Sequence, residues 1–415
     1  MELHGRSVVR TTVVLAALAA SAIALGAPSR AAMRRARGAP HVEAAPAVLN
    51  QIHVLGDRPA PFALDARAAM MIDARSGAVL YAYNEHQKMQ PASLAKLMTF
   101  YLTLQALHQR RITPETMVTV SERAWRLSMN TSVSRMFLGV GQRVPVNDLL
   151  YGLMVSSGND AAVALAEYLG GSSDAFAEQM NQGAQKLGLS DTHFENPDGL
   201  PVPGMYTTAA DMVKLGRAII QTFPDAVTYT GTKEYTFDKI HQPNFNTLLF
   251  HDARVNGLKT GHVDEAGYHL VASAQSDGME LISAVMGTKS PEARRVETEK
   301  LIDWAFRSFA SVKPDWHKAL PDRLRVYCGA ADEVMVGPAE IPYVTVERGQ
   351  ERKVALQGSF ARKYVVAPLP KYQKVGDLLL MVDGKPQSTV PVLTQTAVPQ
   401  GGFFKRAIDR LRLRI

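Results

Sequence analysis

Cysteine is almost absent from this chain of 415 residues, which contains only Cys328. A single cysteine cannot form a disulfide within the chain, so the fold must be stabilised by its apolar core. With 46% hydrophobic residues, the chain has enough apolar material for that core. Cysteine and histidine clusters with zinc-ligand spacing are also lacking, as is any His-Glu-x-x-His sequence. We therefore expect neither a metal nor another cofactor.

The first apolar run, residues 13–27, is short for a membrane span, which needs about 20 apolar residues. It follows Arg6 and Arg10 and contains small residues suitable for cleavage, which predicts a signal peptide over residues 1–27. We therefore expect a periplasmic protein. Four arginines follow this run and oppose translocation: Arg30, Arg34, Arg35 and Arg37. The alternative is a start at Met33, which would leave no export signal.

Acidic residues, 39 in all, are outnumbered by 46 lysines and arginines, so the formal net charge is +7 and the pI is near 9.3. Basic runs interleaved with aromatic residues are lacking in the middle of the chain, so we expect no nucleic-acid partner. Residues 399–415 are also rich in basic residues, and there Phe404, Ile408, Leu411 and Ile415 fall on one helical face. This pattern predicts an amphipathic helix that anchors the protein peripherally to an anionic inner-membrane surface. The alternatives are a frayed tail and a helix docked on the protein.

Changes in composition and periodicity divide the chain into five segments, of which the signal peptide is the first. Residues 28–62 form an Ala- and Pro-rich linker after the signal peptide. Residues 63–312 alternate apolar strands and helices, beginning with a hairpin of strands 68–73 and 78–83 around Arg75-Ser76-Gly77. Residues 313–398 carry short β-type runs and an Asp383-Gly384 turn, which predict a small all-β sandwich domain. The anchor helix, 399–415, follows.

Within residues 63–312, periodicity predicts several regular elements. Helices are expected over 147–169, with a break at 156–160, over 174–187, from Thr208 onward, and over 291–309. Strands are expected over 268–274 and 279–286. The fold class expected from this order is α/β.

Three short motifs contain the candidate catalytic and substrate-binding residues. In Ser93-x-x-Lys96, after Pro91, a helix would place a hydroxyl beside an amine that can act as its base. Ser157-Gly158-Asn159 lies in the break between two apolar helices. Lys259-Thr260-Gly261 precedes the predicted strands, and a glycine there allows close backbone approach. Taken singly, each motif also has a plain structural interpretation. The first would lie on a solvated helix, the second in an ordinary helix–helix loop, and the third in a surface turn.

Together and in this order, the motifs resemble those of serine D-Ala-D-Ala carboxypeptidases, the low-molecular-mass penicillin-binding proteins. The resemblance includes Met136-Phe137-Leu138, Gly199-Leu200, Asn244-x-Asn246, Gly267-Tyr268, the β domain and the tail. It implies a helical lobe beside a five-stranded antiparallel sheet, with helices on the other face of the sheet and the active site between lobe and sheet.

The resemblance also implies a role for each motif residue. Ser93 would attack the carbonyl of the penultimate D-alanine, Lys96 would act as general base, and Ser157 would relay the proton to the leaving amine. The expected substrate-binding residues are Asn159, Lys259, Thr260, Gly261, His262 and Arg294. The backbone N–H groups of Ser93 and His262 would form the oxyanion hole.

Two positions depart from the family pattern. Phe245 stands between Asn244 and Asn246 where many relatives carry an arginine that supports carboxylate binding. Val263 stands where a threonine is common. The first departure bears on the balance between carboxypeptidase and endopeptidase action.

The function implied is removal of the terminal D-alanine from peptidoglycan stem pentapeptides, with penicillin acylating Ser93. Three alternatives are a DD-endopeptidase, a β-lactamase, and a largely non-catalytic penicillin-binding scaffold or cell-shape protein. Class A β-lactamases need a Glu-x-x-Leu-Asn segment, which does not occur between Asn159 and Lys259.

Overall fold

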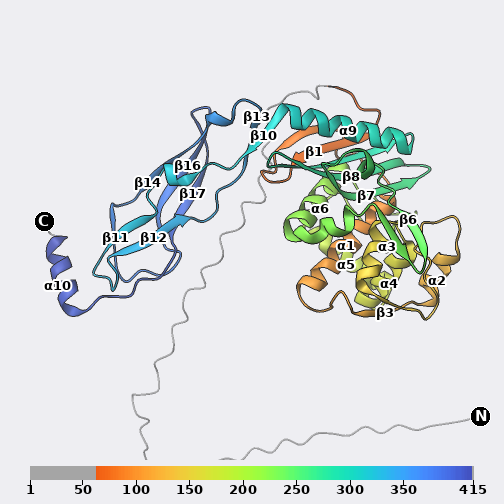
Figure 1. Cartoon of the computed structure of the whole chain (residues 1–415), viewed down its shortest axis with the longest axis horizontal. Coiled ribbons are helices and arrows are strands. Elements are labelled where there is room, and N and C mark those ends of the chain that lie inside the picture. Colours follow the sequence, from red (N-terminus) through yellow and green to blue (C-terminus); the bar gives the residue numbers. More distant parts are fainter. Residues whose placement is uncertain (1–61, 414–415) are drawn as a thin grey trace, which may run out of the picture. The chain divides into compact units, whose positions relative to one another are not determined.

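The computed structural model describes residues 62–413 (Figure 1). The predicted signal peptide (1–27) and all of the predicted linker (28–62) except its last residue lie outside the described residues.

A five-stranded antiparallel sheet forms the centre of the N-terminal part, as the family resemblance implies. Its strand order is β2-β1-β9-β8-β7. The strands are β1 (Ala68–Asp73), β2 (Val79–Tyr83), β7 (Val255–Val263), β8 (Gly267–Ser276) and β9 (Met279–Thr288). Every residue of β1 is buried, because this strand lies inside the sheet and both sheet faces are covered. The predicted hairpin and the two predicted later strands are confirmed.

Different helices cover the two faces of this sheet. Leu301 and Phe306 of α9 (Pro291–Ser308) pack with Met71 on one face. On the other face, Gly216 of α6 (Ala209–Thr222) would bring a Cβ to within 3.0 Å of Ile282. Thr208 begins α6 by accepting a hydrogen bond from the Asp211 N–H, as its position in the sequence predicts.

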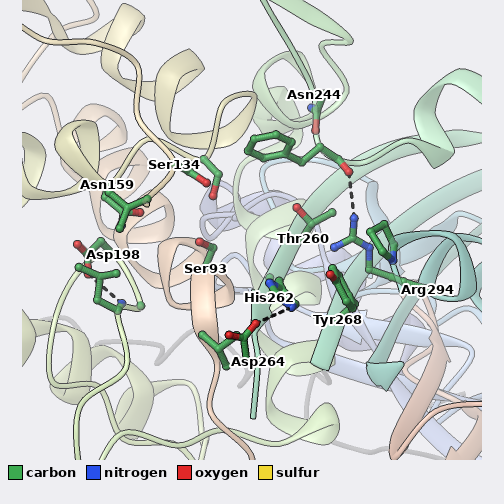
Figure 2. A pocket seen from close by; sticks show the side chains of 18 of the residues that line it. Ser93, Ser134, Asn159, Asp198, Asn244, Thr260, His262, Asp264, Tyr268 and Arg294 are labelled. Atoms are coloured by element: carbon green, nitrogen blue, oxygen red, sulfur yellow. Dashed lines mark hydrogen bonds and ion pairs between the residues drawn. The ribbon is translucent and has the colours of Figure 1, made fainter. Parts of the chain in front are cut away.

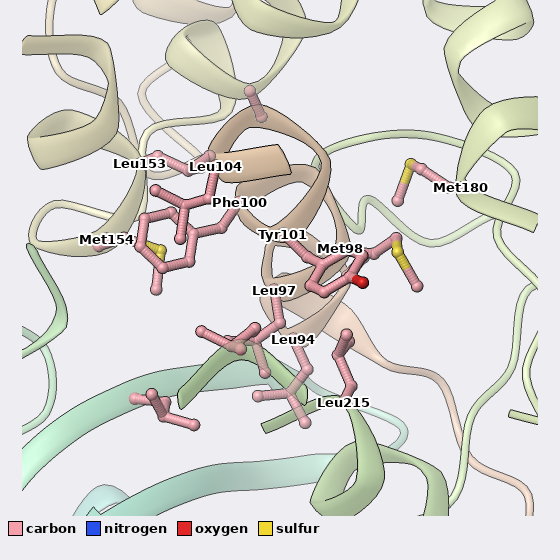
Figure 3. Close-up of a cluster of buried hydrophobic side chains, with 14 of the residues drawn as sticks. Leu94, Leu97, Met98, Phe100, Tyr101, Leu104, Leu153, Met154, Met180 and Leu215 are labelled. Carbon is pink, nitrogen blue, oxygen red and sulfur yellow. The ribbon is translucent and has the colours of Figure 1, made fainter. Parts of the chain in front are cut away.

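The helical lobe contains five helices (Figure 1). They are α1 (Lys96–His108), α2 (Glu122–Met129), α3 (Val146–Met154), α4 (Asn159–Gly170) and α5 (Ser173–Lys186). Of these, α3, α4 and α5 pack against α1, and α2 packs against α4. Figure 3 shows Phe100 and Leu104 of α1 beside Leu153 and Met154 of α3, with Met180 of α5 on another side. The predicted break between α3 and α4 is confirmed.

Short elements complete the lobe and join it to the sheet. They are the 3₁₀ turns η1 (Ala92–Ala95) and η2 (Pro224–Ala226), the strands β3 (Met117–Thr119), β4 (Arg143–Pro145), β5 (Glu234–Phe237) and β6 (Ile240–Pro243), and the helices α7 (Val227–Thr230) and α8 (Leu248–His251). The β5–β6 hairpin leads directly into Asn244-Phe245-Asn246.

The region after α9 is all-β, as predicted. One six-stranded sheet has the order β14-β16-β17-β12-β11-β15, and β10 (Phe309–Val312) pairs with β13 (Val344–Glu347). The six strands are β11 (Arg323–Tyr327), β12 (Glu333–Pro338), β14 (Val354–Phe360), β15 (Tyr364–Val366), β16 (Lys374–Val382) and β17 (Lys385–Thr394). The 3₁₀ turns of this region are η3 (Trp316–Lys318) and η4 (Glu351–Lys353).

Two features of this sheet bear on the sequence predictions. The Asp383-Gly384 hairpin joins β16 to β17, with both turn residues at positive φ. Strand β12 was not identified from the sequence, although it ends in Gly337-Pro338, a dipeptide typical of turns.

The chain ends in α10 (Phe403–Arg412), within the predicted anchor segment. Across residues 62–413, none of the helices combines the length and apolar character that crossing a bilayer requires.

Candidate active site

Ser93 lies in the turn η1, which runs directly into α1 at Lys96. The predicted α-helix therefore begins with a 3₁₀ turn, which still places the two side chains together. The Lys96 Nζ lies 3.0 Å from the Ser93 Oγ. The turn opens with Ala92 at a φ of 48°, a strained backbone conformation for a residue other than glycine.

The Lys96 amine is fully buried at the floor of the site. It donates hydrogen bonds to the Asn159 Oδ1 at 2.6 Å and to the Asp198 backbone carbonyl. Burial lowers the pKa of Lys96 to about 8, and the negative charges of Asp198 and Asp160 only partly oppose this shift. A minority of the amine is therefore neutral near pH 7, and this neutral form can accept the Ser93 proton.

The break between α3 and α4 brings Ser157 and Asn159 to the same site. Ser157 is buried and has a φ of 56°, and the Asn159 N–H donates to the Ser134 carbonyl. The neighbouring Asp160 carboxylate accepts hydrogen bonds from the Ser128 hydroxyl and the Met136 N–H. Asp160 thus fixes the segment that supports Asn159.

Lys259, Thr260 and Gly261 lie in the edge strand β7, facing the nucleophile turn. Burial lowers the pKa of Lys259 well below its usual value, and the positive charges of Lys96 and Arg294 lower it further. Its ammonium group donates to the Thr260 carbonyl. A Cβ on Gly261 would lie 3.1 Å from the Pro91 carbonyl, so glycine lets β7 lie close to η1.

His262 and Arg294 lie at the other end of the site. The His262 ring stacks on Tyr268 with ring centroids 3.9 Å apart. The buried Arg294 guanidinium donates to the Phe245 carbonyl at 3.2 Å and to the His269 carbonyl at 3.4 Å. Burial lowers the pKa of Arg294 to about 10, so the side chain remains a cation at neutral pH.

These groups meet in a cleft of about 720 Å³. The predicted site residues among its lining are Ser93, Ser157, Asn159, Thr260, Gly261, His262 and Arg294. Figure 2 shows Ser93 between Asn159 on the lobe side and Thr260 and His262 on the sheet side, with Arg294 beyond Thr260. Lys96 and Lys259 do not line the cleft themselves. Lys96 contacts two lining residues, Ser93 and Asn159, and Lys259 contacts the carbonyl of a third, Thr260.

Two residues of the site, Asp198 and Gly199, were not among the predicted site residues, although Gly199-Leu200 forms part of the family resemblance. Burial raises the pKa of the Asp198 carboxyl, and its backbone carbonyl holds Lys96. Gly199 has a φ of 83°, and a Cβ there would lie 1.8 Å from the Ala92 carbonyl oxygen. The Asn196-Pro197-Asp198-Gly199 turn was the available signal, but nothing local links it to Ser93.

The arrangement suits acyl transfer. A serine hydroxyl lies beside a buried amine of lowered pKa, the buried Arg294 cation lines the same cleft, and a second buried amine, Lys259, lies in β7 next to Thr260. Such a site can activate a hydroxyl nucleophile and bind an anionic group of the acyl acceptor or leaving group.

Two family models match the chain. The model described as D-alanyl-D-alanine carboxypeptidase matches residues 56–290, and the model of the penicillin-binding protein 5 C-terminal domain matches residues 318–400.

Individual relatives match over most of the length of both chains. The D-alanyl-D-alanine carboxypeptidase DacC of Escherichia coli K12 is 42% identical over 83% of this chain and 87% of its own. DacA of Haemophilus influenzae is 39% identical over 86% of this chain and 91% of its own. The crystal structure of penicillin-binding protein 5 from Haemophilus influenzae has a TM-score of 0.71 at 38% identity and covers 83% of this chain and all of that one.

Proposed function

The chain belongs to the D-alanyl-D-alanine carboxypeptidase family, and on that premise we propose which of its residues perform the reaction. It is a serine hydrolase of this class. We propose that its substrate is the stem pentapeptide of peptidoglycan and that Ser93 forms the acyl-enzyme. The observation that carries the assignment is the 3.0 Å contact between the Ser93 hydroxyl and the buried Lys96 amine.

In the acylation step, neutral Lys96 accepts the proton of Ser93 while the Ser93 Oγ attacks the carbonyl carbon of the penultimate D-alanine. The backbone N–H groups of Ser93 and His262 stabilise the oxyanion, where a single donor is worth about 2.7–4 kcal/mol. Ser157 then relays the proton held by Lys96 to the leaving amine as the C–N bond breaks. Water then hydrolyses the ester and restores the Ser93 hydroxyl.

Substrate binding is divided between the two walls of the cleft. On the lobe wall, the Asn159 side chain holds a substrate amide. On the sheet wall, Thr260 binds the terminal carboxylate, supported by the positive charge of the buried Arg294 side chain, and the buried Lys259 amine lies next to Thr260 in the same strand. Gly261 contributes by keeping β7 close to the nucleophile turn.

The direct test is release of D-alanine from an acylated Lys-D-Ala-D-Ala peptide by the parent protein and by Ser93→Ala. We expect release by the parent and none by the variant, together with a penicillin adduct on Ser93 in mass spectrometry. An adduct on another residue, or equal release by both proteins, would refute the assignment. The rate at which the penicillin adduct is lost separates this function from a β-lactamase, which deacylates rapidly.

We further propose that the protein is periplasmic and lies on the inner membrane through α10. The polar side of α10 contacts the β domain: buried Asp409 accepts the Cys328 N–H at 2.8 Å, and Lys405 pairs with Asp332 at 2.7 Å. The apolar side chains of Phe404 (81% exposed) and Leu411 (65%) remain in solvent. A helix attached by its polar side, with exposed apolar residues, supports an anionic bilayer as its partner.

Vesicle sedimentation tests this placement. We expect binding to vesicles containing anionic phosphatidylglycerol, weaker binding to pure phosphatidylcholine, and loss of binding on Phe404→Ser with Leu411→Ser. Penicillin labelling checks that the variant is folded. Undiminished vesicle binding by the folded variant would contradict the proposal.

The same proposal divides the chain into functional segments. A signal peptide (1–27) and linker (28–62) precede the peptidase domain (63–312). The β domain (313–398) follows, and the anchor (399–415) completes the chain. The largely separate apolar clusters of the sheet-and-lobe region and of residues 320–398 support this division.

A further inference from the structure

Two phenyl rings of the cleft have no part in the reaction described above. Phe245 and Phe250 both line the cleft and remain 46% and 42% exposed. Large apolar side chains that stay exposed together in a cleft commonly mark contact with a ligand, because covering them removes apolar surface from water. The cleft therefore extends past the polar residues to an apolar wall, here called the Phe245–Phe250 wall.

The backbone holds this wall in place. Phe245 lies between two buried asparagines: Asn244 donates to the Thr232 carbonyl at 2.8 Å, and Asn246 donates to the Gly257 carbonyl at 3.3 Å. Phe250 lies on α8, whose Leu248 and Leu249 are buried, so the helix is anchored by its other side. Both rings are thus carried by fixed backbone, which lowers the entropic cost of binding a ligand on them.

The wall adjoins the place proposed for the substrate carboxylate. The Arg294 guanidinium donates to the Phe245 carbonyl at 3.2 Å, and Thr260 lines the same cleft. Figure 2 shows Arg294, Thr260 and Asn244 around this end of the cleft. In a leaving D-amino acid the carboxylate carbon is bonded directly to the α-carbon. With the carboxylate held by Thr260 and Arg294, a side chain on that α-carbon begins near the backbone that carries Phe245, to which Arg294 is hydrogen-bonded.

We infer that the Phe245–Phe250 wall binds an aliphatic side chain, longer than methyl, on the leaving D-amino acid. The methyl group of D-alanine offers little apolar surface to an exposed phenyl ring, whereas three or four methylene groups offer more surface to bury against Phe245 and extend towards Phe250, whose ring centroid lies 5.8 Å from the Lys233 Nζ. The enzyme would thus also release D-amino acids with extended aliphatic side chains. This inference rests on the proposed function and adds a class of leaving group to it.

The chemistry is unchanged by the larger leaving group. The bond from the Ser93 Oγ to the acyl carbon forms as the C–N bond breaks, and the amine departs with one proton. Water then cleaves the ester to a free acid and the Ser93 hydroxyl. An extended aliphatic chain on the leaving residue can come from a free terminal D-amino acid. It can also come from a diamino acid residue whose aliphatic side chain joins two peptides in a cross-link.

The test compares kcat/KM for acyl-D-Ala-D-norleucine and acyl-D-Ala-D-Ala, using the full chain. We expect the norleucine-to-alanine ratio to fall about tenfold in Phe245→Ala, and to fall also in Phe250→Ala, as methylene contacts in an apolar site are lost. The matched control is Tyr372→Ala in the β domain, where the ring is 47% exposed and the ratio should not change. A cross-linked peptide dimer is tested as a further substrate. If the parent cleaves the dimer and Phe245→Ala cleaves it more slowly, the cross-link is a source of the aliphatic side chain.

Failure of this inference and failure of the proposed function give different results. If the parent releases D-alanine and neither phenylalanine variant lowers the norleucine-to-alanine ratio, the inference is overturned while the proposed function stands. If the parent releases no D-alanine at all, the proposed function itself fails. Penicillin labelling of each variant verifies that it is folded, and the two independent phenylalanine positions keep the test decisive if one variant does not fold.

Discussion

Lys96 shows at the scale of one residue how burial creates a base. Its pKa is lowered to about 8 by burial, while the nearby negative charge of Asp198 acts in the opposite direction. Because only the neutral amine can accept the Ser93 proton, the environment of Lys96 controls the pH range in which Ser93 is reactive.

The first prediction concerns this pH dependence. The rate of penicillin acylation should rise with pH, with a midpoint near pH 8 set by Lys96. In Asp198→Asn the midpoint should move to lower pH, because the charge that raises the pKa of Lys96 is removed. Stopped-flow acylation between pH 5 and 10 measures both midpoints, with Asp277→Asn in an exposed turn as the control. An unshifted midpoint in Asp198→Asn would exclude this electrostatic role.

The second prediction concerns His269, which is fully buried in β8. The Gly287 N–H donates to its Nδ1 at 2.9 Å, and its Nε2–H donates to the Gln90 carbonyl at 3.1 Å. The first bond requires an unprotonated Nδ1 and therefore the neutral ring, because both nitrogens of a charged imidazolium are donors. Burial lowers the pKa of His269 from 6.5 to about 4, so the unfolded chain binds more protons than the folded protein between these values. Stability is therefore lost as pH falls from 6.5 towards 4.

The measurement is the free energy of unfolding at pH 7 and pH 4.5. Over this interval the parent should lose about 2 kcal/mol more than His269→Asn, which cannot gain the charge. Equal losses in the two proteins would show that His269 does not contribute to the acid sensitivity.

At the scale of elements, the nucleophile turn η1 is enclosed by two segments distant in sequence. Gly261 of β7 approaches it closely, with its Cβ position 3.1 Å from the Pro91 carbonyl. Gly199 approaches it still more closely, opposite the Ala92 carbonyl. The position of Ser93 is thus determined by close packing of three segments, in addition to the local backbone.

The third prediction tests this packing. Gly199→Ala should lower the rate of penicillin acylation roughly 100-fold, because the new Cβ displaces the nucleophile turn and such displacements are costly for reaction rates. Gly188→Ala is the matched control. Gly188 also has a positive φ, of 69°, but a Cβ there meets nothing within 4 Å. The control should lose about 1 kcal/mol of stability and keep its acylation rate. Similar acylation by both variants would contradict the packing argument.

At the scale of the whole molecule, the apolar clusters are divided. The cluster of residues 320–398 includes Leu378 and Val392 and shares no member with the clusters that surround the central sheet. Each region therefore has its own apolar core, as expected for domains that fold with some independence.

The fourth prediction follows from this division. Leu378→Ala removes a fully buried side chain and should destabilise the β domain by about 3 kcal/mol. Penicillin acylation, which depends on the other core, should keep its rate and its thermal midpoint. Calorimetry together with labelling after heating measures both, and Leu301→Ala in the α9 cluster should lower the labelling midpoint instead. Loss of labelling in parallel with the β-domain transition would refute independent folding.

The sequence alone determined the features that depend on neighbouring residues. The spacing of Ser93 and Lys96 places the two side chains one helical turn apart, and the periodicity before and after Ser157 predicts two helices with a break. Turn chemistry at Asp383-Gly384 predicts a hairpin, and the order of the three motifs indicates the family. These signals are readable because each arises within a few residues of chain.

Only the tertiary structure decided the features that depend on distant segments. The lowered pKa of Lys96 comes from burial among α4, the Asp198 turn and α1. The approach of Gly199 to Ala92, and the bond from Arg294 to the Phe245 carbonyl, join residues about 107 and 49 positions apart. Electrostatic environment and close packing are properties of the assembled core, so no local pattern encodes them.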